Sequence, residues 1–441
     1  MKHKGFNKKE LKILALSSLG GTLEFYDFII FVFFANIISI HFFPENLSDT
    51  WKLINAYGIF AAGYLARPLG GIFMAHFGDK FGRKNIFMLS ILLMVIPTFA
   101  LAFVPGFEHI GYLAPIILLV IRIAQGIAVG GELPGAWVFI QEHAPTKQKN
   151  LYISLLCASV TAGIFLGALV YLLIYTIFSE EEVKNWAWRV AFGIGGVFGI
   201  ISVYLRKFLE ETPVFLQMKN DNALLSFPLK ELFKRKNSSF AITVSMLSTW
   251  VLTACILLFV LQLPNFVADV LKFNPFEKTY FQILGLCCLI SCIVLIGFLS
   301  DKFSPYKVCI VFCIGFGVFS FLFVKEFYSL HTNINLLLLY YALSCFFSGI
   351  MTCCPIFMSD VFEAKFRFSG ISFSYNIAYA ISGYFTPQLA VFLHILSMQN
   401  KGEILSLSLS FYTIFICFIG ILGSLLSKRF YKNTDNKSQT S

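Results

Sequence analysis

Apolar runs long enough to cross a membrane recur along the whole chain and constrain its fold more than any other feature. A helix needs about 20 mostly apolar residues to span the hydrocarbon core of a bilayer. Twelve such runs lie near residues 11–40, 54–77, 86–104, 113–140, 151–178, 188–205, 239–264, 279–299, 307–324, 334–358, 367–394 and 404–426. Charged residues make up only 13% of the chain, too few to cover a water-facing surface. The sequence therefore predicts an all-α integral membrane protein with twelve transmembrane helices.

The longest polar linker lies between the sixth and seventh runs and divides the twelve into two sets of six. It spans residues 206–238 and carries seven Lys or Arg. The tripeptide Asp79-Lys80-Phe81 returns as Asp301-Lys302-Phe303 in the equivalent loop of the second set, which indicates two related halves. We predict a six-helix bundle over 1–205, a cytoplasmic central loop over 206–238, a second six-helix bundle over 239–426 and a cytoplasmic tail over 427–441.

The distribution of basic residues predicts the orientation in the membrane. Most of the 34 Lys and Arg fall in loops that are cytoplasmic if both termini are cytoplasmic. The formal net charge of +10 therefore reflects contact with the bilayer, and no nucleic-acid partner is expected. The sequence shows no nucleophile–base pair, metal-ligand cluster or nucleotide-binding loop, so the chain is not expected to be an enzyme or to hold a metal.

Five charged residues stand inside the apolar runs, where each costs roughly 2.5–3.5 kcal/mol on insertion scales. They are Glu24 and Asp27 in the first run, Arg67 in the second, and Arg122 and Glu132 in the fourth. Glu24 and Asp27 are three residues apart, so they share one helix face. Arg122, Gln125 and Glu132 fall on one stripe of the fourth helix. We expect these charges to meet in one cavity; the alternative is a static ion-pair cluster that locks helices together.

A carboxylate held beside an arginine and partly removed from water can load and release a proton. Arginine keeps its charge, so each arginine needs a partner throughout. We expect a substrate carboxylate to pair with Arg122, and Arg67 to hold Glu24 or Asp27. The residues predicted to couple protons are Glu24, Asp27 and Glu132. The residues predicted to bind substrate are Arg67, Arg122, Gln125, Tyr26, Trp250, Tyr375 and Asn376, whose aromatic members suit a methylammonium group or ordinary packing equally.

Prolines fall inside several of the predicted spans. They are Pro134, Pro264, Pro355 and Pro387. Because proline has no N–H, each frees a carbonyl of the preceding turn and permits a bend.

Several separated motifs resemble the major facilitator superfamily, and within it the branch of metabolite:proton symporters that includes proline/betaine, alpha-ketoglutarate, shikimate and citrate permeases. The motifs are Gly78-Asp79-Lys80-Phe81-Gly82-Arg83-Lys84, Glu24-Phe25-Tyr26-Asp27-Phe28, Arg67-Pro68-Leu69-Gly70-Gly71, Arg122-Ile123-Ala124-Gln125-Gly126 with Gly130-Gly131-Glu132, Trp188-Arg189 followed by Glu211-Thr212-Pro213, and Arg367-Phe368-Ser369-Gly370 with Tyr375-Asn376. The resemblance covers most of the chain and is weakest over 220–350. Ala75 replaces the usual first glycine of the loop motif, and the second copy has lost its Gly-Arg.

The resemblance implies two six-helix bundles that expose a central site alternately to the two sides of a bacterial inner membrane. It also implies proton-driven uptake of a small polar metabolite, of proline/betaine or organic-acid type. We expect the protein to act as a monomer. The proton gradient would be the driving force, with no other cofactor. Residues of the two loops are expected to act in switching: Asp79, Lys80, Gly82, Arg83, Lys84 and Asp301. Asp79 is expected to cap the helix after its loop or to pair with an arginine.

Two other functions remain open at this point. An uncoupled facilitator of an organic acid would not need the acids at Glu24, Asp27 and Glu132. A membrane sensor that binds without transport would be expected to carry an appended signalling domain, and few residues follow the last predicted span.

Overall fold

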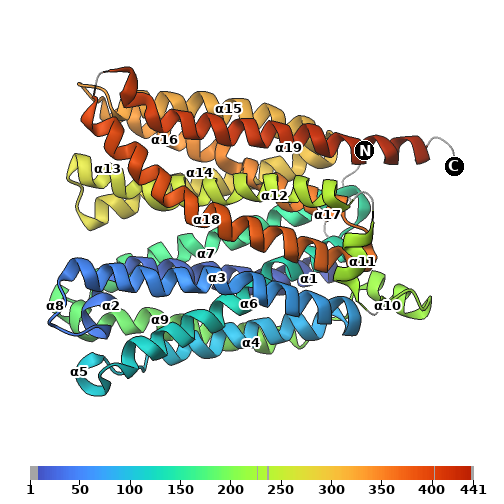
Figure 1. Ribbon diagram of the computed structural model, residues 1–441, viewed down its shortest axis with the longest axis horizontal. Helices are drawn as coiled ribbons and strands as arrows, with labels where there is room; N and C mark the ends of the chain where they lie inside the picture. Colours follow the sequence, from blue (N-terminus) through green and yellow to red (C-terminus); the bar gives the residue numbers. More distant parts are fainter. Residues whose placement is uncertain (1–7, 226, 236–237, 402, 439–441) are drawn as a thin grey trace. The chain divides into compact units, whose positions relative to one another are not determined.

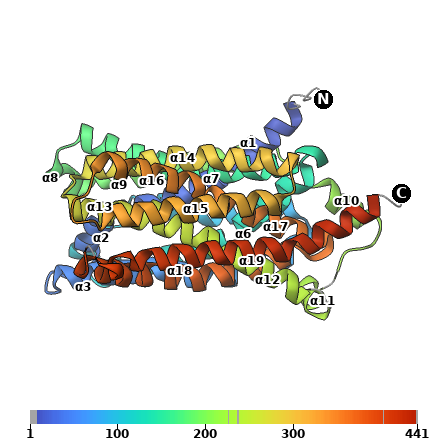
Figure 2. The same ribbon diagram turned by 90° about the horizontal axis from the view of Figure 1, so that it is seen from above.

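The computed structural model describes residues 8–225, 227–235, 238–401 and 403–438, and within them leaves out the side chains of 8–11, Glu24, Phe28, Thr50, Tyr57, Phe60 and 431–438. This part of the chain is helical and contains no strand (Figures 1 and 2). Twelve of its helical segments are long and apolar enough to cross a membrane. They are Lys12–Phe33, Trp51–Phe81, Arg83–Leu101, Leu113–His143, Thr146–Ile177, Glu180–Arg206, Ser238–Leu271, Pro275–Lys302, Pro305–Phe327, Ile334–Val361, Ala364–Gln399 and Ile404–Phe430. The predicted fold class and number of spans are confirmed.

The contacts divide the chain into two compact units. Unit 1 contains residues 1–143, 159–232 and 364–376, and unit 2 contains 144–158, 233–363 and 377–441. Two long helices are shared: α7 (Lys149–Ile177) begins in unit 2, and α18 (Arg367–Gln399) begins in unit 1. The predicted bundle boundaries assign every helix to a single bundle, and they stay a prediction.

Unit 1 is built mainly from helices of the first half of the chain. They are α1 (Lys8–Phe33), α2 (Ala35–Phe42), α3 (Asp49–Phe81), α4 (Arg83–Leu101), α5 (Phe107–Ile110), α6 (Leu113–His143), most of α7, α8 (Glu180–Glu182), η2 (Val183–Ala187), α9 (Trp188–Arg206), α10 (Pro213–Asn220), the start of α11 (Pro228–Lys234), η5 (Ala364–Phe366) and the start of α18. Local sequence explains several of their starts. The Thr212 hydroxyl accepts the Phe215 N–H at 3.2 Å and Pro213 opens α10, as expected for a capped first turn.

Unit 2 contains the helices of the second half. They are η1 (Thr146–Gln148), the start of α7, α12 (Ser238–Ala254), η3 (Cys255–Gln262), α13 (Leu263–Leu271), α14 (Pro275–Lys302), α15 (Pro305–Phe327), α16 (Ile334–Phe347), η4 (Ser348–Thr352), α17 (Cys353–Val361), most of α18, η6 (Ile404–Leu407) and α19 (Ser408–Ser438). Pro264 follows a π-helical segment and Pro355 follows a 3₁₀ segment. Pro134 and Pro387 instead lie inside continuous helices. The predicted irregularity thus appears at two of the four prolines.

The first predicted span, 11–40, is not one helix. It breaks at Phe34, which has φ −99° and ψ 12°, and α2 begins at Ala35. Phe34 is fully buried, and its ring lies 5.4 Å from the ring of Tyr171. Hydropathy does not register this break because the residues around it are mostly apolar.

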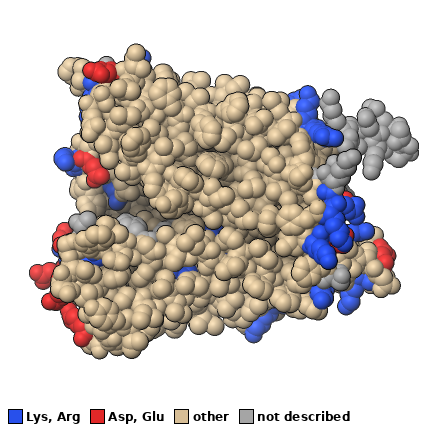
Figure 3. Space-filling view, in the orientation of Figure 1, with Lys and Arg blue, Asp and Glu red and all other residues tan. Residues whose placement is uncertain are grey.

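The surface is apolar where lipid is expected. In the face shown in Figure 3, charged side chains gather mainly toward the two ends of the view, and most of the middle is uncharged. Large apolar side chains that are more than half exposed include Leu65, Phe73, Ile96, Val120, Phe392 and Phe418. Such exposure is unfavourable in water and favourable in a bilayer.

Glycine controls how closely α3 and α6 approach in unit 1. A Cβ added to Gly126 would overlap the backbone carbonyl of Gly63, and a Cβ added to Gly63 would lie 3.0 Å from the carbonyl oxygen of Arg122. Small residues allow such backbone contact between membrane helices.

We expect Gly126→Ala to lower the stability of the purified protein by about 1–3 kcal/mol, the usual cost of overpacking. Thermal unfolding in detergent measures this, and Gly193→Ala is the matched control because no atom lies within 4 Å of its added Cβ. Equal melting temperatures for Gly126→Ala and the wild type would contradict the close approach.

Candidate transport site and switching contacts

A buried ion pair joins α1 and α6 at the centre of the predicted site. Nη1 of Arg122 donates to Oδ2 of Asp27 at 3.1 Å, and both side chains are buried. Nε2 of Gln125 donates to the same Oδ2 at 2.8 Å. The stripe predicted on the fourth span therefore does bring Arg122 and Gln125 to Asp27.

Further contacts hold this pair in position. Nη1 of Arg122 also donates to Oε1 of Gln125 at 2.7 Å, and Gln125 donates to the Thr98 hydroxyl at 2.9 Å. The guanidinium lies 3.8 Å from the centroid of the Phe31 ring. The second carboxylate oxygen of Asp27, Oδ1, has no hydrogen-bond partner among the described side chains. A proton can be placed there without displacing the Arg122 contact.

Tyr26 and Glu24 flank Asp27 in the sequence. Tyr26 is fully buried and donates its hydroxyl to the Ala191 carbonyl of α9 at 2.8 Å. It therefore braces α1 against α9 in this structure. Glu24 lies on α1, and its side chain is outside the described residues.

A second buried ion pair holds Glu132, separate from the first. Glu132 pairs with Arg206 and accepts the hydroxyl of Ser90, and all three side chains are almost completely buried. Nη1 of Arg206 also donates to the Phe87 carbonyl at 2.9 Å. The single cluster expected from the sequence is thus divided.

Arg206 was missed by the sequence analysis, which placed it in the central loop. It is the last residue of α9 and fully buried. Its guanidinium lies 3.7 Å from the centroid of the Phe87 ring. The sequence did offer a signal, because a buried Glu132 needs a cationic partner and Arg122 already shared its helix face with Gln125. Arg206 was overlooked because it lies at the end of an apolar run, where an arginine is ordinarily solvated.

Arg67 forms a third group, with residues of α18. Its Nε donates to Oδ1 of Asn376 at 3.5 Å and its Nη2 to the Tyr375 hydroxyl at 3.4 Å. The guanidinium lies 5.5 Å from the Tyr375 ring centroid, and Trp137 packs edge-on against Tyr375 at 4.9 Å. Arg67 was expected to hold Glu24 or Asp27. Asp27 pairs with Arg122 in this structure, and the Glu24 side chain lies outside the described residues, so the pairing of Arg67 with Glu24 stays a prediction.

Trp250, the remaining predicted substrate residue, lies on α12 in unit 2. The other predicted binding residues lie in unit 1. A role for Trp250 beside them stays a prediction.

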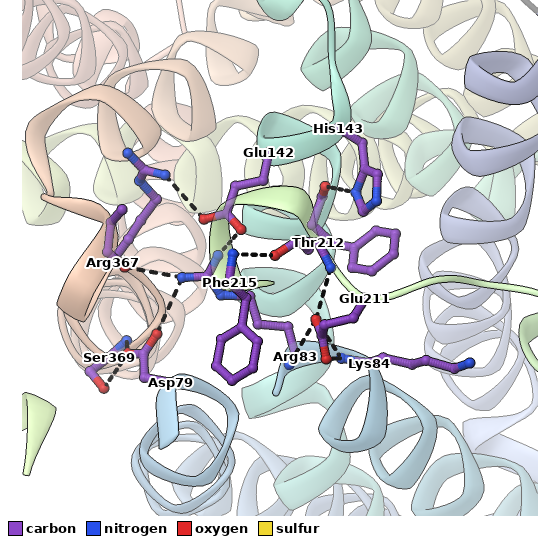
Figure 4. A network of polar contacts seen from close by, with 12 residues as sticks. Asp79, Arg83, Lys84, Glu142, His143, Glu211, Thr212, Phe215, Arg367 and Ser369 are labelled. Atoms are coloured by element: carbon purple, nitrogen blue, oxygen red, sulfur yellow. Dashed lines mark hydrogen bonds and ion pairs between the residues drawn. The ribbon is translucent and has the colours of Figure 1, made fainter. Parts of the chain in front are cut away.

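Figure 4 shows a dense polar network around the loop between α3 and α4. The Asp79 carboxylate accepts the backbone N–H of Ser369 at 2.9 Å and its hydroxyl at 2.8 Å. Asp79 also lies 3.5 Å from Nη2 of Arg83. Arg83 pairs in addition with Glu142, which in turn pairs with Arg367 at 3.1 Å. Buried charges require partners of opposite charge, and in this network the acidic and basic side chains pair with one another within unit 1.

Asp79 pairs with arginine as expected, but it does not cap the helix after its own loop. It caps the first turn of α18, and Glu211 caps α4 by accepting the backbone N–H groups of Arg83 and Lys84, each at 3.2 Å (Figure 4). Carboxylates are favourable at helix N-termini. Gly82 has φ +113°, and a Cβ there would also press on Glu211.

The roles predicted for the remaining loop residues stay predictions. Lys80 is exposed and lies over the Phe81 ring, 5.2 Å from its centroid. Glu142 was missed, because it sits just beyond the predicted fourth span, where an acidic residue is ordinarily solvated.

Unit 2 repeats the same chemistry around Asp301. Its carboxylate accepts the backbone N–H groups of Asn150 and Leu151, each at 2.9 Å, and so caps the first turn of α7. Lys149 pairs with Asp360 beside it. The loop has lost the glycine and arginine of the first copy, yet the carboxylate cap is retained.

Known proteins resemble this chain over almost its whole length. The family model described as Major Facilitator Superfamily matches residues 18–387. The "Glycine betaine/proline/ectoine/pipecolic acid transporter OusA" of Dickeya dadantii (strain 3937) is 31% identical and covers 97% of this chain and 84% of its own. The "Proline/betaine transporter" of Escherichia coli (strain K12) is 30% identical and covers 95% and 83%.

Two solved structures share the fold at low sequence identity. The proton:xylose symporter XylE bound to 6-bromo-6-deoxy-D-glucose has a TM-score of 0.79 at 17% identity, covering 96% of each chain. The E. coli fucose:proton symporter FucP has a TM-score of 0.67 at 13% identity, covering 95% and 98%. The chain belongs to the Major Facilitator Superfamily, and it is a multi-pass membrane transporter.

The geometry predicts that Glu132 stabilises the fold through its buried pair with Arg206. Removing one charge of a buried ion pair costs about 3–5 kcal/mol, so Glu132→Gln should lower the melting temperature and membrane yield because it leaves Arg206 uncompensated. Ser90→Ala, which removes only a hydroxyl, should cost about 1–2 kcal/mol. Thermal unfolding of both purified variants measures this. If Glu132→Gln is as stable as the wild type, the pair is not structural.

Proposed function

We propose that the chain is a proton-coupled symporter that imports small carboxylated zwitterions of the proline/betaine type. The observation that carries the proposal is the buried Asp27–Arg122 pair, reinforced by Gln125. A charge pair inside the apolar part of a membrane protein is costly and marks a functional pathway by default. The names of the relatives support the substrate class, because both include proline and betaine.

The pair offers a direct way to couple substrate and proton. Arg122 cannot shed its charge at working pH, so it requires an anion in every state. When a substrate carboxylate pairs with Arg122, Asp27 loses its cation and favours the protonated form. When the substrate leaves, Arg122 takes Asp27 back and the proton is released. The exchange needs no further titrating group.

The two carboxylate caps provide contacts that can change when the transporter switches between conformations. Asp79 holds the first turn of α18 in unit 1, and Asp301 holds the first turn of α7 in unit 2. We propose that both caps lie on the cytoplasmic side, with both termini in the cytoplasm, and that they break and re-form during each cycle. A bacterial inner membrane is the proposed location, with the monomer as the working unit and the proton gradient as the driving force.

An uncoupled facilitator is disfavoured by the same site. It would equilibrate substrate without a titrating carboxylate, so no constraint would place Asp27 beside a buried arginine. Uptake of labelled glycine betaine against its gradient, abolished by an uncoupler, tests the proposed function directly. Equilibration without accumulation would favour the facilitator.

Asp27→Asn removes the titrating group and the anionic partner of Arg122, so some loss of stability is expected as for Glu132→Gln. It keeps the shape of the side chain and one hydrogen-bond acceptor, and the substrate carboxylate can supply the anion that Arg122 requires. We expect steady-state accumulation to fall by about tenfold or more, equivalent to at least 1.4 kcal/mol of lost coupling, while exchange of labelled for unlabelled substrate continues. Asp49→Asn is the control, because that carboxylate is exposed beside Lys52. Uncoupler-sensitive accumulation by Asp27→Asn at the wild-type level would show that Asp27 does not couple.

Arg122→Lys keeps the charge but loses the planar fork that suits a carboxylate. We expect apparent affinity for glycine betaine to weaken by about tenfold, in line with the loss of one charge-assisted hydrogen bond. Arg67→Lys is the comparison, because Arg67 contacts Asn376 and Tyr375 in this structure. Equilibrium binding to both purified variants decides the matter. A loss confined to Arg67→Lys would reverse the assignment.

Asp79→Asn weakens the cap on α18 without touching the Asp27–Arg122 pair. Because the cap acts on switching, we expect the maximal transport rate to change by more than the apparent affinity. Initial rates over a range of substrate concentrations separate the two quantities. An unchanged maximal rate with weakened affinity would place Asp79 in binding.

A further inference from the structure

A backbone carbonyl of α6 lacks its usual helical donor and is occupied by a side chain of α18. Pro134 lies inside α6, and proline has no N–H to offer the carbonyl four residues earlier. That carbonyl belongs to Gly130. Nδ2 of Asn376 donates to it at 2.8 Å. The contact lies within unit 1, to which residues 364–376 belong.

The Asn376 amide is fully engaged in this arrangement. Its Nδ2 also donates to the Ser372 carbonyl at 2.8 Å, and its Oδ1 accepts from Nε of Arg67 at 3.5 Å. The residue is completely buried. An amide carries two N–H hydrogens, and both have a protein acceptor here. Asn376 therefore has no hydrogen left to donate to a substrate.

Gly71 leaves the space that the amide occupies, and Gly130 allows α3 and α6 to approach closely beside it. A Cβ on Gly71 would overlap the Asn376 side chain and lie 2.9 Å from the Gly130 oxygen. A Cβ on Gly130 would lie 2.7 Å from the Gly71 nitrogen. Pro134 leaves the Gly130 carbonyl free to accept a hydrogen bond, and the two glycines leave room for the close approach.

We propose that the carbonyl of Gly130, freed by Pro134, is a receptor for Asn376, and that this contact latches the first part of α18 to α3 and α6 in one state of the transport cycle. Asn376 is then a positioning residue rather than a substrate ligand. The inference goes beyond the proposed function, since it needs only that the chain is a transporter and not that protons drive it.

The latch is suited to reversible use. An intrahelical bond would satisfy the carbonyl permanently, whereas the bond to Asn376 is lost when the start of α18 leaves unit 1. The polar groups left behind then require water, so release of α18 and hydration of this part of α6 occur together. A substitution that restores a helical donor at position 134 should therefore favour release.

The test uses amide hydrogen exchange of the purified full-length protein, measured by mass spectrometry on peptides that cover 364–376. Asn376→Ala removes the donor, and Pro134→Ala supplies a backbone N–H that competes for the Gly130 carbonyl. Each single variant should speed exchange in this segment by about tenfold. The double variant should match the single ones, because both remove the same contact.

Controls separate the latch from general loosening. Pro97→Ala also restores a helical N–H, but in α4 and not in α6, whose carbonyl Asn376 occupies, and should leave exchange of 364–376 unchanged. Pro134→Ala is expected to fold even if Asn376→Ala does not, because it removes a helix-breaking residue. Unchanged exchange in Pro134→Ala, or single effects that multiply in the double variant, would overturn the proposal.

A transport measurement distinguishes positioning from binding. With labelled glycine betaine, Pro134→Ala and Asn376→Ala should alter the maximal rate and leave the apparent affinity within about twofold. A selective loss of affinity in Asn376→Ala would make it a substrate ligand and contradict the latch. If glycine betaine is not transported at all, the proposed substrate fails, while the exchange result still decides the latch.

Discussion

The Asp27–Arg122 ion pair is the interaction on which the rest of unit 1 depends. Two opposite charges buried among apolar helices are tolerable only while they stay paired. Gln125 and Thr98 fix the geometry of the pair, the Phe31 ring covers the guanidinium, and Tyr26 braces α1. Because arginine remains charged, any event that removes Asp27 must supply another anion. The pair thereby links packing, charge and substrate recognition in one place.

Three polar groups with separate partners, rather than one large cluster, organise unit 1. Arg122 holds Asp27, Arg206 holds Glu132, and Arg67 holds residues of α18. This division separates tasks that a single cluster would mix. Both carboxylate oxygens of Glu132 have partners and the pair is buried, as suits a structural tie, whereas Oδ1 of Asp27 has no partner among the described side chains. Arg67 instead contacts Tyr375 and Asn376 of α18, the helix that is shared between the two units.

Sequence patterns predicted local features well and long-range pairings poorly. Hydropathy was sufficient for the twelve spans, and helical spacing placed Arg122 and Gln125 on one face. Two pairings escaped, those of Arg206 with Glu132 and of Glu142 with Arg83, because each depends on how two helices rotate about their own axes. The break at Phe34 escaped because it lies in a mostly apolar stretch, where hydropathy gives no signal. Asp79 was expected to act locally, but its acceptor oxygens reach a helix nearly 300 residues further along the chain.

Infrared difference spectroscopy of the purified protein tests the central claim most directly. A protonated carboxyl group has a carbonyl stretching band that a carboxylate lacks. If a substrate carboxylate replaces Asp27 on Arg122, adding glycine betaine should produce this band in the wild type, and the band should be absent in Asp27→Asn and present in Asp49→Asn. A substrate-induced band of full size in Asp27→Asn would contradict the account, because another group would then take up the proton.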